Sequence, residues 1–298
     1  MNSCRLTFSV LMVMMIGYVH AQEYAFKVLV NKGKNEIKSG NNWQQLKVGL
    51  SLKSADELKI SENAYLGLVH VSGKALELKE SGNYKVMDLA AKVSGGSSVL
   101  NKYTDFILSS TTTPKNRLAA TGAVNRGVDN IDVYLPKPEQ AVVYNNEVII
   151  QWNAEAPGPY VVTFNSMFDD ELDKIEVTDS NVKINLDDNN LANEDNIIVQ
   201  VASVSNKNKI SNKYTLKRLS KADKERIKAS LNEIETPTSE ANALNKLLIA
   251  GFYEQNNLLI DAGTAYLEAI KLSPDVPQFK EAYNDFLSRN NLRSTQKK

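Results

Sequence analysis

The hydrophobic pattern of the chain changes its period after Lys217, and this change limits the folds that are open to it. Before Lys217, apolar residues recur in short runs with period two. In residues 75–79, for example, Leu76 and Leu78 alternate with charged residues, as in a half-buried strand. After Lys217 the apolar residues recur with helical spacing. We therefore expect a multidomain β + α protein whose 298 residues suffice for two or three domains.

The first residues indicate export. Arg5 precedes a nearly continuous apolar stretch, residues 6–19, which ends in Val19-His20-Ala21 with small residues at the positions that a signal peptidase reads. This pattern predicts a secretory signal peptide, residues 1–21, cleaved between Ala21 and Gln22. The apolar stretch is shorter than the ~20 residues that a membrane span needs, which argues against an N-terminal membrane anchor. No later segment is apolar enough to cross a membrane, so we expect no membrane span after signal removal.

The number of cysteines and the balance of charges limit the cellular location and the kinds of partner. Cys4 is the only cysteine and leaves with the signal. A mature chain without disulfides favours the periplasm, or secretion to the cell surface, of a Gram-negative bacterium. The 35 basic and 35 acidic residues cancel and are interspersed, which argues against nucleic-acid binding.

Residues 24–96 are expected to form a small all-β domain, with strands near residues 26–30, 64–69 and 75–79. Within this region Trp43, Leu46, Gly49 and Leu52 precede Asp56-Glu57-Leu58, a small-residue strand 64–68, and Gly73 before Leu76-Glu77-Leu78. This succession resembles the FecR-type β domain, and it departs from the family pattern at Ala55, where a glycine is usual. The resemblance implies the fold and a Bacteroidetes-like cell-envelope setting. The membrane helix through which known members relay a signal has no counterpart in this sequence.

Residues 97–134 are expected to be a short helix and a linker. Val99, Tyr103, Phe106 and Ile107 fall on one side of a helix over residues 97–109. Ser, Thr, Gly and Pro residues after it are typical of linkers.

Residues 135–217 are predicted to form a second β domain. Short apolar strands are expected at residues 148–152, 160–164, 182–186, 197–202 and 213–216. A proline-led strand that ends in Trp152 and is followed by Tyr160-Val161-Val162 resembles fibronectin type III and related immunoglobulin-like sandwiches. We interpret Trp152 as a core residue of such a sandwich.

Residues 218–291 are predicted to be helical, and residues 292–298 to be a polar tail. Ser220 and Asp223 predict the capped start of a first helix. Pro277 predicts the start of a final helix, and its apolar stripe is formed by Phe279, Ala282, Tyr283, Phe286 and Leu287. Between these two helices, residues 243–276 resemble one tetratricopeptide repeat. The resemblance is carried by small or aromatic residues at the positions where the repeat has them, and by a proline that ends the second helix: Ala243, Ala250, Tyr253, Ala262, Tyr266, Ala269 and Pro274.

The resemblance to this repeat implies a possible protein-binding face. Its concave surface would carry Leu244, Leu247, Gly251 and Glu254. One repeat cannot bury its own apolar face. We expect the flanking helices to sandwich it so that this face packs within the chain; the alternative is that a partner completes the stack.

The sequence has no recognisable catalytic, cofactor or metal site. His70 is the one histidine left after signal removal, and we interpret it as a strand-end residue with a local hydrogen bond. The nucleophile-elbow and phosphate-loop motifs are missing. The acidic groups 169–173, 187–188 and 194–195 lie between predicted strands and are interpreted as solvated turns rather than calcium or glycosidase sites.

These observations predict an exported, non-enzymatic adaptor or assembly protein of the cell envelope that acts through protein–protein contacts, with no cofactor and no evident small-molecule substrate. One alternative is a soluble FecR-like sensory or regulatory protein. A second is glycan or peptidoglycan binding by the β-sandwich, which would need exposed aromatic residues on a strand face.

Overall fold

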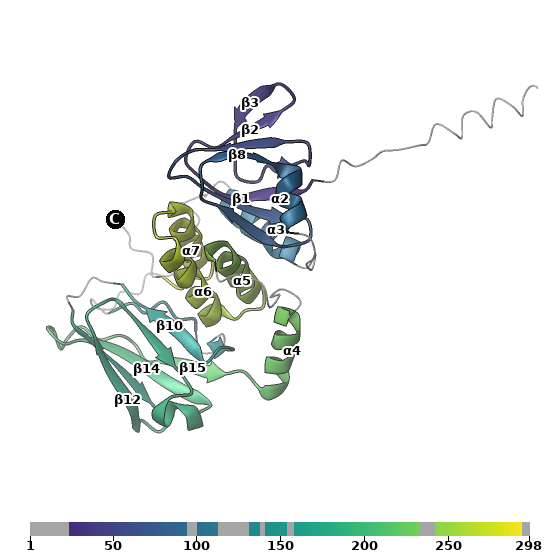
Figure 1. Cartoon of the computed structure of the whole chain (residues 1–298). Coiled ribbons are helices and arrows are strands. Elements are labelled where there is room, and N and C mark those ends of the chain that lie inside the picture. The colour runs from purple at the N-terminus through teal and green to yellow at the C-terminus, as the bar shows by residue number, and fades with distance from the viewer. Residues whose placement is uncertain are drawn as a thin grey trace, which may run out of the picture.

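The computed structural model describes residues 24–93, 100–112, 131–137, 141–153, 158–232 and 242–293. The expected signal peptide with its Ala21–Gln22 site, most of the expected linker and residues 294–298 of the expected polar tail lie outside these ranges. The prediction of a polar tail is wrong at its first residue, because Leu292 is 5% exposed and belongs to the helical core. The mixed β and α fold is confirmed (Figure 1). Within the described ranges, every helix is too short or too polar to cross a membrane.

The N-terminal β domain contains two four-stranded antiparallel sheets, with strand orders β4-β1-β6-β7 and β3-β2-β5-β8. Phe26, Leu52, Leu58 and Leu66 lie in the core between them. Its elements are β1 Phe26–Lys32, β2 Glu36–Ser39, β3 Asn42–Gln45, β4 Ser51–Leu52, β5 Glu57–Ile60, β6 Tyr65–His70, β7 Ala75–Leu78, β8 Gly82–Lys85 and the helix α2 Val86–Lys92.

Strand β6 is buried on both faces, which explains its nearly continuous apolar sequence. Leu66 and Leu68 face the core of the N-terminal domain. Tyr65 and Val69 face the other way and belong to a core that they share with the helices. The first sheet is thus covered on its second face by the C-terminal part of the chain.

The second β domain contains a five-stranded sheet, β12-β11-β14-β15-β9, and a two-stranded sheet, β10-β13. Their shared core holds Trp152, Tyr160 and Phe164, and the rings of Trp152 and Tyr160 meet edge to face at 5.3 Å. The elements are β9 Val142–Val143, β10 Glu147–Gln151, β11 Tyr160–Asn165, β12 Glu171–Val177, β13 Asn181–Asn185, the 3-10 helix η2 Asn189–Asn193, β14 Asn196–Ser203 and β15 Tyr214–Arg218.

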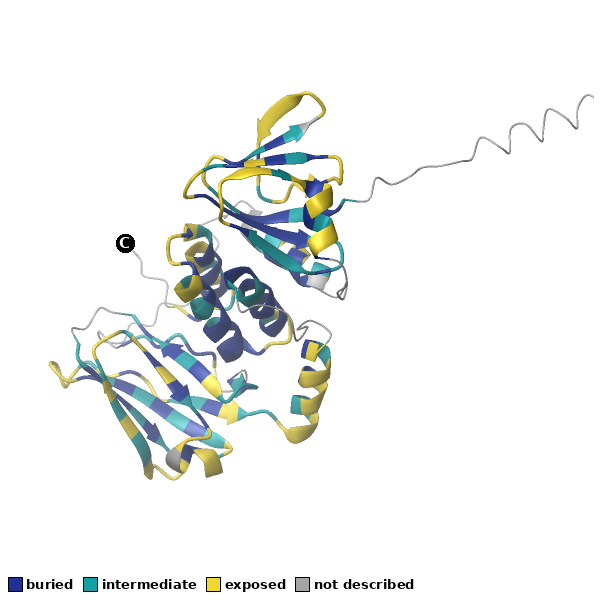
Figure 2. Cartoon of the chain, viewed as in Figure 1, coloured by how far each residue is buried: buried dark blue, intermediate teal, exposed yellow. Residues whose placement is uncertain are grey.

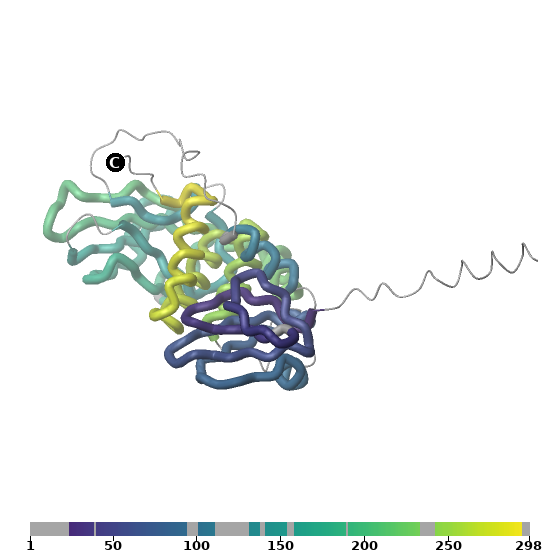
Figure 3. Tube along the Cα trace, turned by 90° about the horizontal axis from the view of Figure 1, so that it is seen from above, coloured from purple at the N-terminus to yellow at the C-terminus, as the bar shows by residue number. Residues whose placement is uncertain are grey.

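Helices α5 (Ala243–Gln255) and α6 (Leu259–Leu272) pack against each other between the two β domains (Figures 1 and 3). Ala250, Ala262 and Ala269 are completely buried, so the two helices approach closely there. Helix α7 (Pro277–Arg289) packs on α6 and begins at Pro277 as predicted, and all five residues of its predicted stripe are buried. Figure 2 shows that α5 and α6 are largely buried.

Helix α4 (Lys221–Asn232) begins as its capping pattern predicts, because the Asp223 backbone N–H donates to Ser220 Oγ at 3.2 Å. Ile227 and Leu231, two residues of the apolar face expected for this helix, enter the helical core. Ile234, the third residue of that face, and Pro237, the expected end of the helix, lie outside the described residues. The helix that packs on α5 is instead α3 (Leu100–Thr112), which runs three residues beyond the helix expected at 97–109.

Two further differences from the sequence analysis concern β-structure. Ile131 and Val133, inside the expected linker, are buried in the second β domain, where Val133 pairs with Trp152. Strand β12 was missed: the interpretation of residues 169–173 as a turn between strands is wrong for Glu171 and Asp173, which lie in this strand. Its many charged residues hid the alternation of Ile175 and Val177.

Gly67 tests the contact between the first sheet and α5. A Cβ atom at this position would lie 3.0 Å from Leu244 Cδ1 and 3.2 Å from Val30 Cβ. We expect Gly67→Val to lower the free energy of unfolding by about 1–3 kcal/mol through overpacking, measured by denaturant titration.

Gly263→Ala is the control. Its Cβ meets only Phe286, at 3.6 Å. This change should stabilise the chain by about 0.5–1 kcal/mol. Wild-type stability in Gly67→Val would contradict this packing.

Candidate functional site

Polar side chains of low exposure link the helix pair to each of the two β domains. On the N-terminal side the link is Glu77 of β7, whose side chain is 8% exposed. Its carboxylate accepts hydrogen bonds from the Tyr65 hydroxyl at 2.6 Å and from the Leu244 backbone N–H at 2.8 Å. Because Leu244 lies in the first turn of α5, a carboxylate of the β domain caps this helix and complements its dipole.

Burial and the hydrogen bond to Glu77 raise the pKa of Tyr65 well above its ordinary value. Tyr65 therefore stays a neutral donor. The ammonium group of Lys79 binds the second oxygen of Glu77 at 2.7 Å. The charge of Glu77 is thus compensated by a cation, a hydroxyl and a helix start, as a nearly buried carboxylate requires.

On the other side the link is Asp261 of α6, which is completely buried. Its two oxygens accept hydrogen bonds from the backbone N–H groups of Tyr144 and Asn145, at 2.9 and 2.8 Å. Tyr144 and Asn145 connect β9 to β10, so this helix side chain caps a turn of the second β domain. Burial raises the pKa of Asp261 to about 6, and the backbone hydrogen bonds counteract part of this rise.

Neighbours of Asp261 reinforce the same interface. Thr264 Oγ1 accepts a hydrogen bond from the Ile149 backbone N–H of β10 at 2.9 Å. Asn145 Nδ2 donates to the Tyr253 hydroxyl of α5 at 2.9 Å. Ile260 of α6 is 3% exposed and belongs to the core of the second β domain. One helix therefore contributes to two hydrophobic cores.

Two ion pairs and a hydrogen bond lie at the edge of the contact between the N-terminal β domain and the helices. Lys32 of β1 binds Asp275, in the α6–α7 connection, at 2.5 Å, and Lys27 binds Asp105 of α3 at 2.6 Å. Gln278 Nε2 of α7 donates to the Asn31 carbonyl at 2.8 Å. The two exposed ion pairs each contribute little to stability, about 0–1 kcal/mol.

The four residues of the expected protein-binding face all lie inside the molecule. Leu244 and Leu247 are buried, and the Gly251 backbone packs against Ile107 of α3. Glu254 has a 6% exposed side chain and accepts from the Tyr266 hydroxyl, from Arg289 and from Asn290, which ties α5 to α6 and α7. A partner would reach this face only after both α3, which covers Gly251, and the N-terminal sheet, which covers Leu244, had moved.

His70 lies at the end of β6, as the sequence analysis placed it. Its Nδ1 accepts the Ser72 backbone N–H at 3.1 Å and lies 2.8 Å from Ser72 Oγ, and its ring meets Phe26 edge to face at 5.0 Å. Burial lowers the pKa of His70, which favours the neutral ring. These contacts are those of a residue that holds a turn.

The acidic groups form local contacts rather than a common centre. Asp169 binds Lys213 at 2.5 Å, Asp170 contacts Ser166 Oγ, and Asp187 contacts Arg218 at 3.3 Å. Within the described ranges, no group of three or more His, Cys, Asp or Glu side chains is arranged to hold a metal ion.

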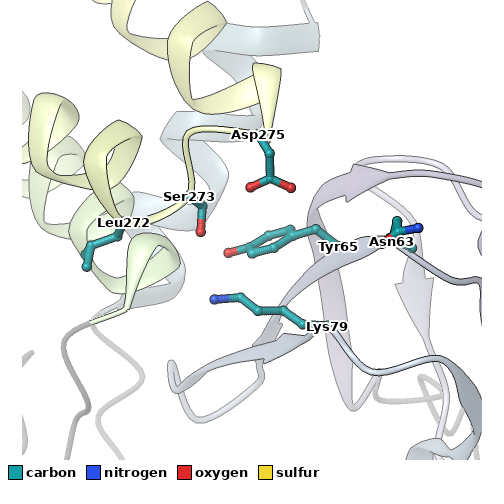
Figure 4. A pocket seen from close by; sticks show the side chains of 7 residues that line it. Asn63, Tyr65, Lys79, Leu272, Ser273 and Asp275 are labelled. Carbon is teal, nitrogen blue, oxygen red and sulfur yellow. The ribbon is translucent and has the colours of Figure 1, made fainter.

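A shallow cavity of about 190 Å³ opens where the N-terminal domain meets the α6–α7 connection (Figure 4). Tyr65, Lys79, Ser273 and Asp275 line it together with Asn63, Ala64 and Leu272. Lys79 is already paired with Glu77, and Asp275 with Lys32. The cavity is smaller than the roughly 300–1,000 Å³ of typical small-molecule sites, and its charges are compensated.

Exposed apolar side chains lie mainly on the β domains. Phe168 and Met167, in the β11–β12 turn, are 89% and 54% exposed, Met87 of α2 is 61% exposed, and Trp43 of β3 is 41% exposed. Leu272 is exposed on the helices. Trp43, the first residue of the pattern that resembles the FecR-type domain, is therefore a surface residue. No protein-family model matches the chain, and no curated protein is significantly similar to it.

Asp261 gives the interface a pH dependence with a defined sign. Its pKa is about 6 in the folded chain and 3.8 ordinarily, so folding favours the protonated form. The stability from this carboxyl is fully present below about pH 3.8 and is lost as the pH rises through about 6. Between about pH 4 and 7, the wild type should lose up to about 3 kcal/mol relative to Asp261→Asn, measured by denaturant titration at each pH.

Thr264→Val is the matched control, because it removes a non-titrating acceptor from the same interface. Its effect on the free energy of unfolding should be the same at both pH values. A difference between the wild type and Asp261→Asn that does not change with pH would contradict the buried position of this carboxyl.

Proposed function

We propose that this chain is an exported, non-catalytic adaptor or assembly protein of a Gram-negative cell envelope. It holds two β domains in a fixed relative orientation and binds protein partners through their outer surfaces. The observation that carries this proposal is the burial of the α5–α6 pair between the domains, with Glu77 and Asp261 as the polar links. The export signal and the envelope setting come from the sequence.

We further propose the finer fold assignments. The facing sheets around Phe26 and Leu66 support a FecR-like N-terminal domain, and its turn at Asp56 forms with Ala55 in place of glycine: the Lys53 N–H donates to Asp56 Oδ2 at 2.7 Å. Two sheets packed around a buried Trp152 support an immunoglobulin-like second domain. The close α5–α6 pair with its buried alanines supports a tetratricopeptide-like repeat.

The regulatory alternative has one observation in its favour. Trp43 and Met87, both exposed, lie on the FecR-like domain, where a signalling partner would dock. Glycan binding by the second domain has less support, because Trp152, Tyr160 and Phe164 are each at most 3% exposed. We therefore retain protein binding as the proposed activity.

Deletion of the helical end cannot test this function, because both β domains pack against it. A photo-reactive amino acid placed singly at Phe168, Met87 or Leu272 in the native cell tests it with little perturbation. The adaptor function predicts cross-links to a protein partner from both Phe168 and Met87. The regulatory alternative predicts cross-links from Met87 alone. Leu272, 45% exposed on the helical layer, is the matched control and should give none. Cross-links from Leu272 alone, or from no position, would contradict the proposal.

A further inference from the structure

The sheets of this chain differ in how their outer edges are protected. The edge strand β7 lies against α5, through Glu77 and Leu244. On the edge strand β12, Asn190 Nδ2 donates to the Leu172 carbonyl at 3.2 Å, and Asp173 Oδ1 accepts the Lys174 N–H at 2.7 Å. Covering and capping of this kind prevent an edge from pairing with another chain.

Strand β3 has no such protection. In its pairing with β2, Ile37 lies opposite Gln44 and Lys38 opposite Trp43, and the Leu46 N–H donates to the Asn35 carbonyl at 2.8 Å. Hydrogen-bonded pairs alternate along an antiparallel ladder, so Gln44 bonds to β2 while the backbone groups of Trp43 and Gln45 point outward. These two N–H and two C=O groups have no partner within the described part of the chain.

The side chains of this edge are exposed and uncharged. All four residues of β3 are exposed, and the segment 39–46 contains no charged residue. The β2–β3 hairpin projects from the domain (Figures 1 and 2), so its edge is open to another molecule. Trp43 lies on the outer face of the sheet, where Lys38 contacts its ring at 5.9 Å, while Ile37 is buried on the inner face.

We propose that β3 pairs antiparallel with β3 of a second copy of this chain, about a two-fold axis at Gln44. In this register Trp43 lies opposite Gln45 of the second copy, and Gln45 opposite its Trp43. All the outward backbone groups of both strands are then satisfied, by four hydrogen bonds. The two four-stranded sheets β3-β2-β5-β8 become one continuous eight-stranded sheet.

The observations favour a second copy because the edge is complementary to itself. Two-fold pairing about Trp43 instead would place Gln45 opposite Asn41, which lies in the hairpin turn and not in the strand. The uncharged segment brings no like charges together, and the chain from Gln22 onward, which lacks only the charge of Arg5, has a formal net charge of −1, so long-range repulsion between copies is small. Only a four-residue strand is shared, so we expect a weak dimer, with a dissociation constant on the order of micromolar or higher.

Sedimentation of the chain from Gln22 onward, over about three orders of magnitude in concentration, tests the association. We expect a reversible monomer–dimer equilibrium. Gln44 lies opposite itself across the axis, so Gln44→Lys and Gln44→Glu should each weaken the dimer at least about tenfold through like-charge repulsion. An equimolar mixture of the two variants should restore it. Unchanged circular dichroism of each variant excludes a folding defect.

A cysteine cross-link tests the register. The chain from Gln22 onward has no cysteine. In the proposed pairing Gln44 faces itself in a non-hydrogen-bonded pair, whose Cα atoms lie about 4.5 Å apart, within the Cα range that a disulfide allows. Gln44→Cys should therefore form a covalent dimer on mild oxidation. Lys59→Cys, exposed on β5 of the same sheet but away from the edge, should not. A wild type that stays monomeric throughout, a dimer that Gln44→Lys does not weaken, or equal cross-linking of both cysteine variants would overturn the proposal.

Discussion

The arrangement of this chain depends on the burial of one helix pair on two sides. Helices α5 and α6 are too short and too apolar to be stable in water by themselves, and each has faces that need covering. The sheet β4-β1-β6-β7 covers one side, and β9 and β10 of the second β domain cover another. Because Tyr65 and Val69 belong to the helical core, and Ile260 to the core of the second domain, neither β domain is complete without the helices.

Polar contacts determine how these surfaces fit together. Apolar packing alone is non-directional, whereas a buried carboxylate must find its donors. Glu77 accepts a hydrogen bond from the first turn of α5, and Asp261 accepts hydrogen bonds from two backbone N–H groups in the connection between β9 and β10. Each therefore fixes the register of one domain on the helices. The fixed orientation that the proposed adaptor function requires follows from these two side chains.

Much of the fold could be predicted from local patterns. The strands around Val28, Leu66 and Val199, the capped start of α4 and the apolar stripe of α7 follow from periodicity and from Ser, Asp and Pro signals. The role of α3 could not be predicted, because nothing near Ile107 in the sequence indicates that it covers Gly251, 144 residues later. Strand β12 was missed because an edge strand carries many charged residues.

The candidate site was harder to predict than the fold. The face with Leu244, Leu247, Gly251 and Glu254 was expected to pack within the chain, with a bound partner as the alternative. Which of the two holds depends on distant parts of the chain. Glu77 alternates with Leu76 and Leu78 and looks like a solvent-facing residue of a strand. Asp261 looks like an ordinary acidic residue in the first turn of a helix. Their importance comes from long-range contacts that no local pattern contains.

If the helix pair joins both β domains into one cooperative unit, the whole chain should unfold together, and scanning calorimetry of the chain from Gln22 onward measures this. We expect one unfolding transition in which the calorimetric and van't Hoff enthalpies agree, and which moves as a whole to lower temperature in Glu77→Ala. Two separate transitions, with the second β domain unaffected by Glu77→Ala, would contradict it.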